Sequence, residues 1–143
     1  MKNLLILITI LLPATMVAQD MDFTVWSKLA NVEYEKSEDE YGEVYIPAFS
    51  DEIEGMANKE IVLPGYIMPF EGMFTPKHIF LSSLPAAACY FCGSGGPETV
   101  AEVYMAEPIE FTNEIVQIKG VLKLNATDYN QMMYILDEAK LID

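Results

Sequence analysis

The sequence predicts a mainly β protein, a small five-stranded barrel or sandwich with a short N-terminal helical extension. From residue 60 onward, short segments rich in β-branched and aromatic residues follow one another, separated by Gly, Pro and Asn. Helical spacing of apolar residues is confined to the part before residue 60. Short strands joined by turn-rich connections are typical of small barrels and sandwiches.

The first 18 residues have the features of a secretory signal peptide. Lys2 supplies a positive start, an apolar run extends from Leu4 to Leu12, and small residues occupy 14–18. The run is shorter than the about 20 residues that span a bilayer. We therefore expect cleavage after Ala18, no stable membrane insertion, and an exported protein that is periplasmic or secreted.

The chain is strongly acidic, with eight lysines, no arginine and 22 Asp and Glu residues, for a formal charge of −14. Removal of residues 1–18, with Lys2, would leave 125 residues (143 − 18) and a charge of −15 (7 − 22). This length suits one domain. Nucleic-acid binding requires a basic surface, so this class of partner is disfavoured. The charge indicates a cationic protein partner, a metal ion or simply a solvated acidic surface that keeps the protein soluble.

Residues 19–58 are predicted to form an N-terminal extension that packs on the barrel. Trp26 and Leu29 have helical spacing. Residues 33–43 are dominated by acidic side chains, which favours an exposed connection or hairpin. A short helix or turn is expected to end near Asn58.

Residues 59–143 are predicted to form the barrel. Pro64 and Gly65 indicate an edge strand, a bulge or a barrel corner, and Gly120 indicates a bend. The expected strands lie in 60–70, 78–83, 99–106 and 114–125, followed by one at 133–136 and a short final one at 140–142.

Both cysteines lie in "CYFCGSGGPE", residues 89–98, ahead of a glycine-rich turn. In an exported protein, Cys89 and Cys92 predict a disulfide. So short a loop would stabilise the fold only modestly. The alternative is a metal site, because two thiolates in Cys-x-x-Cys can point to one tetrahedral zinc ion, and soft sulfur also suits copper.

A tetrahedral metal site needs two more ligands. His78 is the only histidine, and Glu98 follows the cysteine loop. The candidate metal ligands are therefore Cys89, Cys92, His78 and Glu98, and a second chain could instead complete a four-cysteine site. Apart from zinc or copper, no cofactor is expected.

Catalytic chemistry is not indicated by the sequence. Thiol–disulfide exchange requires a thiolate with a lowered pKa, usually at a helix N-terminus or beside a cation, whereas "GSGGPE" is a turn. A Ser-His-Asp arrangement is not supported either. We therefore expect no enzyme and assign no catalytic residue.

Most of the chain after the signal peptide resembles a family of small exported bacterial proteins classified as a domain of unknown function. The resemblance rests on the ordered segments "GYIMPF", "FLSS", the Cys-x-x-Cys loop ending in Gly-Pro, "VAEVYM", "VQIKGVLKL" and "YILDEAKLI", together with Trp26, Leu29, Pro47 and Phe49. It implies export, an OB-like barrel and an association of some relatives with metal-responsive transport systems. It supplies no enzymatic activity. OB-like barrels often bind oligonucleotides, but the acidic charge argues against that use here.

Two functions follow from these observations. The first is a metal-binding or metal-homeostasis accessory protein that uses the Cys-x-x-Cys loop. The alternative is a non-enzymatic protein- or ligand-binding module in which Cys89 and Cys92 form a structural disulfide.

Overall fold

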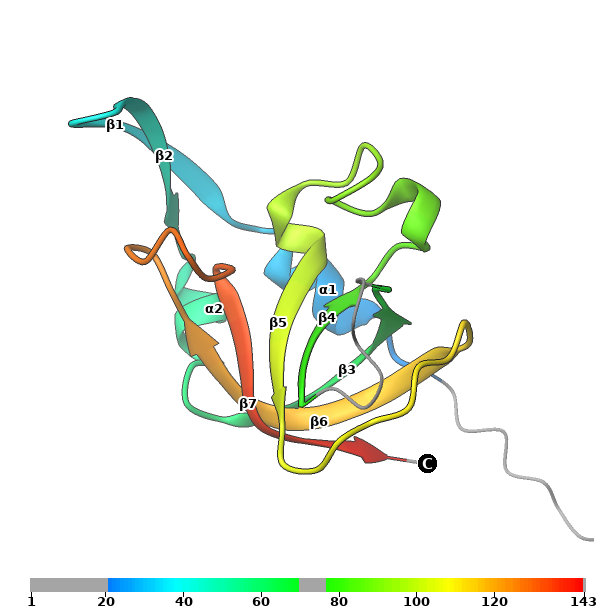
Figure 1. The fold of residues 1–143 in the computed structure, drawn as a ribbon. Helices are drawn as coiled ribbons and strands as arrows, with labels where there is room; N and C mark the ends of the chain where they lie inside the picture. The colour runs from blue at the N-terminus through cyan, green and yellow to red at the C-terminus, as the bar shows by residue number, and fades with distance from the viewer. Residues whose placement is uncertain (1–20, 70–76, 143) are drawn as a thin grey trace, which may run out of the picture.

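A computed structural model describes residues 21–69 and 77–142, and the predicted signal peptide lies outside these residues. Five strands form a closed barrel, flanked by a two-stranded hairpin and two short α-helices (Figure 1). The prediction of a mainly β protein with a small five-stranded barrel and a short helical extension is confirmed. Within the described ranges, no helix is long and apolar enough to cross a membrane.

The barrel strands are β3 (Glu60–Ile67), β4 (His78–Ser82), β5 (Val100–Met105), β6 (Ile115–Leu124) and β7 (Tyr134–Ile142). Around the barrel their order is β3-β4-β5-β7-β6. Only β5 and β7 pair in parallel; the other neighbouring strands are antiparallel. If the five barrel strands are numbered 1 to 5 in chain order, their order around the barrel is 1-2-3-5-4.

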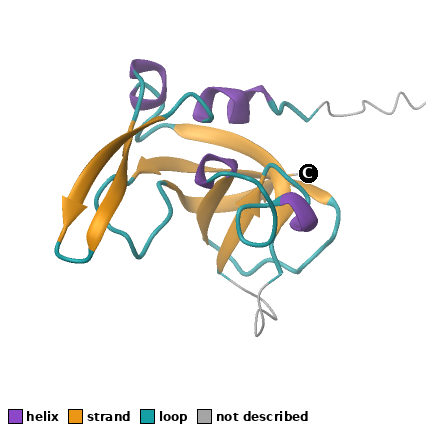
Figure 2. Ribbon diagram, turned by 90° about the horizontal axis from the view of Figure 1, so that it is seen from above, coloured by secondary structure: helices purple, strands orange, loops and turns teal. Residues whose placement is uncertain are grey.

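The N-terminal part contains α1 (Thr24–Leu29), β1 (Glu33–Asp39), β2 (Gly42–Ala48) and α2 (Asp51–Glu54). The acidic segment thus forms a hairpin, with Gly42 in a positive-φ conformation at its turn. The hairpin extends beyond the barrel, and the helices α1 and α2 lie on one side of the barrel (Figure 2). Two 3-10 turns, η1 (Ala86–Ala88) and η2 (Pro97–Thr99), flank the cysteine loop.

Two buried hydrogen bonds fasten α1 to the barrel. The indole Nε1 of Trp26 donates to the carbonyl of Pro64 in β3 at 2.6 Å, and the hydroxyl of Tyr134 in β7 donates to the carbonyl of Leu29 at 2.6 Å. The Trp26 and Leu29 side chains belong to the same core cluster as the inward side chains of the strands. The predicted helical spacing of Trp26 and Leu29 therefore reflects their packing on the barrel.

The last strand differs from the sequence prediction. Two strands were expected at 133–136 and 140–142, but β7 is continuous and its register with β6 shifts between Lys119 and Val121. Glu138 has a φ of 51°, and this bulge interrupts the side-chain alternation. Gly120, where the sequence predicts a bend, lies within this register shift. A Cβ there would lie 2.8 Å from the carbonyl oxygen of Asp137, so only glycine fits this crossing.

The Tyr134 hydrogen bond yields a stability prediction. We expect Tyr134→Phe to lower the free energy of unfolding by about 1–3 kcal/mol, because the ring still packs while the buried Leu29 carbonyl loses its donor. Urea unfolding followed by Trp26 fluorescence measures this change. Tyr41→Phe is the matched control, since Tyr41 is 89% exposed. Equal stability of Tyr134→Phe and the wild type would contradict the role of this bond.

Candidate functional site

The outer face of β4 and β5 carries an unusual set of side chains. Core positions alternate with His78 and Phe80 along β4, and with Glu102 and Tyr104 along β5. The antiparallel register sets His78 opposite Tyr104 and Phe80 opposite Glu102. Four side chains with aromatic or acidic groups are thus neighbours on one surface.

Glu102 is only 3% exposed although it lies on this outer face. Its Oε1 lies 2.7 Å from Nε2 of His78 and accepts a hydrogen bond from the Tyr104 hydroxyl at 2.8 Å. Its Oε2 accepts from the backbone N–H of Met132 at 2.9 Å, and Gln131 Nε2 donates to the Tyr104 hydroxyl at 3.0 Å. A buried carboxylate is costly unless it is hydrogen-bonded, so this cluster fixes β4, β5 and the loop between β6 and β7 at one point.

Five rings in contact extend from this cluster and form what we term the aromatic row, made of Tyr104, His78, Phe80, Phe91 and Tyr90. His78 stacks on Tyr104 with ring centroids 4.6 Å apart and an interplanar angle of 7°. The next centroid separations are 5.4 Å to Phe80, 5.2 Å to Phe91 and 5.4 Å to Tyr90. The His78 side chain is 49% exposed, Tyr90 43% and Phe91 38%. The row therefore offers ring surface to solvent.

The buried carboxylate also affects the Tyr104 phenol. The hydrogen bond to Glu102 raises the pKa of Tyr104, because only the protonated phenol can donate it, and burial adds to the effect. Tyr104 thus remains a neutral donor that holds its ring in place at the start of the row.

The cysteine loop supplies the other end of the row, since Tyr90 and Phe91 lie between the two cysteines. The backbone N–H of Gly93 donates to the Cys89 carbonyl at 2.7 Å and closes a tight turn. Cys89 is 1% exposed, whereas Cys92 is exposed. Both are free thiols, so the predicted disulfide is not formed in this structure. The turn leaves one side chain inside the loop and the other at the surface.

The four predicted metal ligands are not brought together. His78 Nε2 faces Glu102, and Glu98 Oε2 accepts a hydrogen bond from the Tyr34 hydroxyl at 3.0 Å. Within residues 21–69 and 77–142, no three His, Cys, Asp or Glu side chains gather in a group that could hold a metal ion. His78 is instead linked to the cysteine loop by ring contacts: His78 contacts Phe80, and Phe80 contacts Phe91, which lies between the two cysteines.

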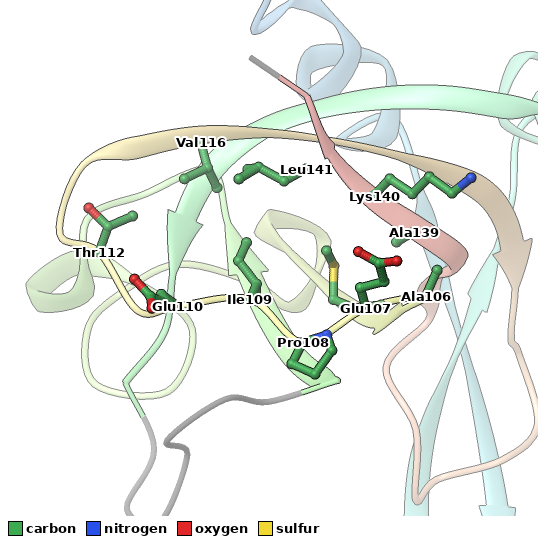
Figure 3. Close-up of a pocket in the computed structure, with 11 residues that line it drawn as sticks. Ala106, Glu107, Pro108, Ile109, Glu110, Thr112, Val116, Ala139, Lys140 and Leu141 are labelled. Atoms are coloured by element: carbon green, nitrogen blue, oxygen red, sulfur yellow. The ribbon is translucent and has the colours of Figure 1, made fainter.

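A pocket of about 800 Å³ lies beside the segment that follows β5 (Figure 3). Its buried lining is apolar and includes Met105, Ile109 and Ala139. The carboxylate of Glu107 and the amine of Lys140 belong to exposed side chains at its rim. Its charged side chains are exposed to solvent and form no cluster comparable to that around Glu102.

Sequence reasoning found His78 but missed Glu102, Phe80 and Tyr104. A signal for Glu102 was present, because an acidic residue in the strand segment "TVAEVYMA" is flanked by apolar residues. The aromatic row itself could not be read from the chain, because it forms only when β4 and β5 pair in this register and the cysteine loop folds back onto them.

Comparison with known proteins supports the fold. Neither a protein-family profile nor a curated protein matches this chain. Among solved structures, a DUF3299 family protein from Pseudomonas aeruginosa is similar, with a TM-score of 0.51 over 68% of each chain and 16% sequence identity. At this identity the likeness shows the fold alone. A neighbour from a family of unknown function agrees with the resemblance expected from the sequence. That the Cys-x-x-Cys loop and export are features of such a family stays a prediction.

The Glu102 cluster predicts a titration effect. We expect Glu102→Gln to lower the pKa of Tyr104 toward its ordinary value of about 10, because an amide oxygen favours the protonated phenol less. The raised pKa in the wild type means that this hydrogen bond stabilises the fold fully below about pH 10 and loses its effect as the pH rises through the raised pKa.

NMR signals of the tyrosine ring carbons, followed against pH, measure this pKa. Glu110→Gln, at an exposed carboxylate, is the control and should leave the Tyr104 titration unchanged. A Tyr104 pKa that is the same in Glu102→Gln as in the wild type would refute the assignment.

Proposed function

We propose that this protein is a non-enzymatic binding module that holds a polypeptide partner against the aromatic row. The observation that carries the proposal is the contact of five rings, three on the outer face of β4 and β5 and two on the cysteine loop, with substantial exposure of His78, Phe91 and Tyr90. Aromatic side chains are enriched in protein interfaces and supply a large contact area with few rotatable bonds. Contiguous exposed apolar surface of this kind commonly marks an interaction site.

The location of the row in the barrel supports the proposal. The strand order 1-2-3-5-4 and the parallel pair of β5 with β7 support the OB-like description. OB-type barrels bind ligands on the face of their second and third strands and with the loop between the fourth and fifth. Here these are β4, β5 and the loop that carries Gln131 and Met132, the same segments that meet at Glu102.

The charge of the chain indicates the kind of partner. A net charge of −14 opposes binding of nucleic acid through phosphates. It favours a partner that carries Lys or Arg, whose cationic groups are also attracted to the faces of Tyr and Phe rings. Export, which the first 18 residues predict, would place this partner outside the cytoplasm.

A non-catalytic role is consistent with the surroundings of His78. In the described part of the chain its hydrogen-bond partner is Glu102, and no hydroxyl or thiol is positioned by the imidazole as a nucleophile. Glu102 instead orients the His78 ring, which stacks on Tyr104 as part of the row.

Selection of displayed random peptides on the purified protein tests the proposal. We expect peptides enriched in Lys or Arg, with binding weakened about tenfold by Phe91→Ala, a typical effect of removing an interface aromatic residue. Phe111→Ala is the matched control, because Phe111 is 45% exposed and lies outside the row. The proposal fails if no peptide is selected, or if Phe91→Ala and Phe111→Ala weaken binding equally.

A second function, binding of zinc or copper in a metal-homeostasis role, is favoured by a different observation. Cys89 and Cys92 are free thiols separated by two residues in a short turn, which is the donor spacing of many thiolate metal sites. Two thiolates supply half of a tetrahedral set. The other ligands would come from a second chain or a partner, or from His78 and Glu98 after they leave Glu102 and Tyr34.

Zinc titration in competition with a chromophoric chelator tests this second function. We expect one ion per chain, or one per two chains for a four-cysteine site, and loss of binding in the double variant Cys89→Ser/Cys92→Ser. A lower zinc affinity in Glu98→Gln would show that Glu98 is a ligand, and an unchanged affinity would show that it is not. Zinc affinity that is unchanged in the double variant would rule out a cysteine site.

A further inference from the structure

We propose that a groove between the β1–β2 hairpin and the barrel binds a proline-rich, lysine- or arginine-containing segment in the extended polyproline II conformation. The groove is open to solvent and has a volume of about 240 Å³. The residues of this tyrosine groove that matter for the argument are Tyr34, Tyr45, Tyr90, Tyr129, Pro47 and Pro97. The inference rests on the proposed function, because Tyr90 belongs both to the groove and to the aromatic row.

Four tyrosines from four separate segments converge on the groove. Tyr34 lies in β1, Tyr45 in β2, Tyr90 in the cysteine loop and Tyr129 in the loop before β7. Their exposed fractions are 39%, 62%, 43% and 63%. The two hairpin tyrosines share this surface with Tyr90 and Tyr129 because the hairpin lies next to the loops at this end of the barrel (Figure 1). The arrangement is therefore a product of the fold and not of a local aromatic cluster.

One hydrogen bond ties the hairpin to the cysteine loop region. The Tyr34 hydroxyl donates to Glu98 Oε2 at 3.0 Å. Burial, together with this bond to a carboxylate, raises the pKa of Tyr34, so the phenol stays protonated and holds its position. Tyr34 also pairs with Pro47 across the hairpin, which places a ring and a proline side by side on the groove wall.

The amide side chains of the groove are already used inside the protein. Asn125 Nδ2 donates to the carbonyls of Asp128, Gln131 and Met132, and Gln131 Nε2 donates to Tyr104. A carbohydrate would need such groups for its many hydroxyls. The groove instead offers mainly ring faces and phenol hydroxyls, which fits a ligand with apolar rings and a few carbonyl acceptors.

A polyproline II segment has these properties. Its proline rings pack on aromatic side chains, its carbonyls form no internal hydrogen bonds, and its preformed conformation lowers the entropy cost of binding. Charge complementarity adds the basic residues. Asp128 lines the groove and Glu98 adjoins it, in a chain with 22 acidic residues and eight lysines.

Calorimetric titration with two synthetic peptides tests the inference. In the first, prolines alternate with lysines; in the second, Gly and Ser replace the prolines and the lysines are kept. We expect the first peptide to bind and the second to bind at least tenfold more weakly. Binding of the first should weaken about tenfold in Tyr129→Ala and stay unchanged in Tyr41→Ala, at the 89% exposed hairpin tip.

Equal affinity for the two peptides would overturn the inference, because charge alone would then explain binding. Equal effects of Tyr129→Ala and Tyr41→Ala would overturn it as well. Failure of the groove is distinguishable from failure of the proposed function. If displayed peptides bind the row in a Phe91-dependent manner while the proline–lysine peptide does not bind, the groove inference alone is wrong.

Discussion

The outer face of this barrel depends on the hydrogen bonding of one buried carboxylate. Glu102 has almost no contact with water, and an unpartnered charge in such a place would be strongly destabilising. Its partners come from β4, β5 and the loop before β7, so the positions of His78, Tyr104 and Met132 follow from one constraint. The aromatic row begins at Tyr104, which donates a hydrogen bond to Glu102 and stacks on His78.

A binding surface gains from being rigid before its partner arrives, because less conformational entropy is then lost on association. The closed barrel supplies that rigidity, and α1 reinforces it through the Trp26–Pro64 and Tyr134–Leu29 hydrogen bonds. The cysteine loop is the less regular end of the surface. It carries two rings of the row and two free thiols, so any chemistry at the cysteines would act directly on the shape of the row.

Local patterns in the sequence predict the elements of this fold better than they predict its site. The Trp26–Leu29 spacing and the alternation in "EIVQIKGVLKLN" are encoded within single segments. The bulge at Glu138 broke the alternation of β7 and made one strand resemble two. The site is different in kind, because the stacking of His78 on Tyr104 and the burial of Glu102 arise from strand register and a distant loop, which no local pattern specifies.

The most direct test of the aromatic row as a binding surface is photo-crosslinking in the cells that produce the protein. A photoreactive phenylalanine analogue placed at position 91 should form a covalent adduct with a polypeptide, and adding His78→Ala should reduce the yield. The same analogue at position 111, an exposed phenylalanine outside the row, should form none. No adduct from position 91, or equal adducts from both positions, would contradict the account.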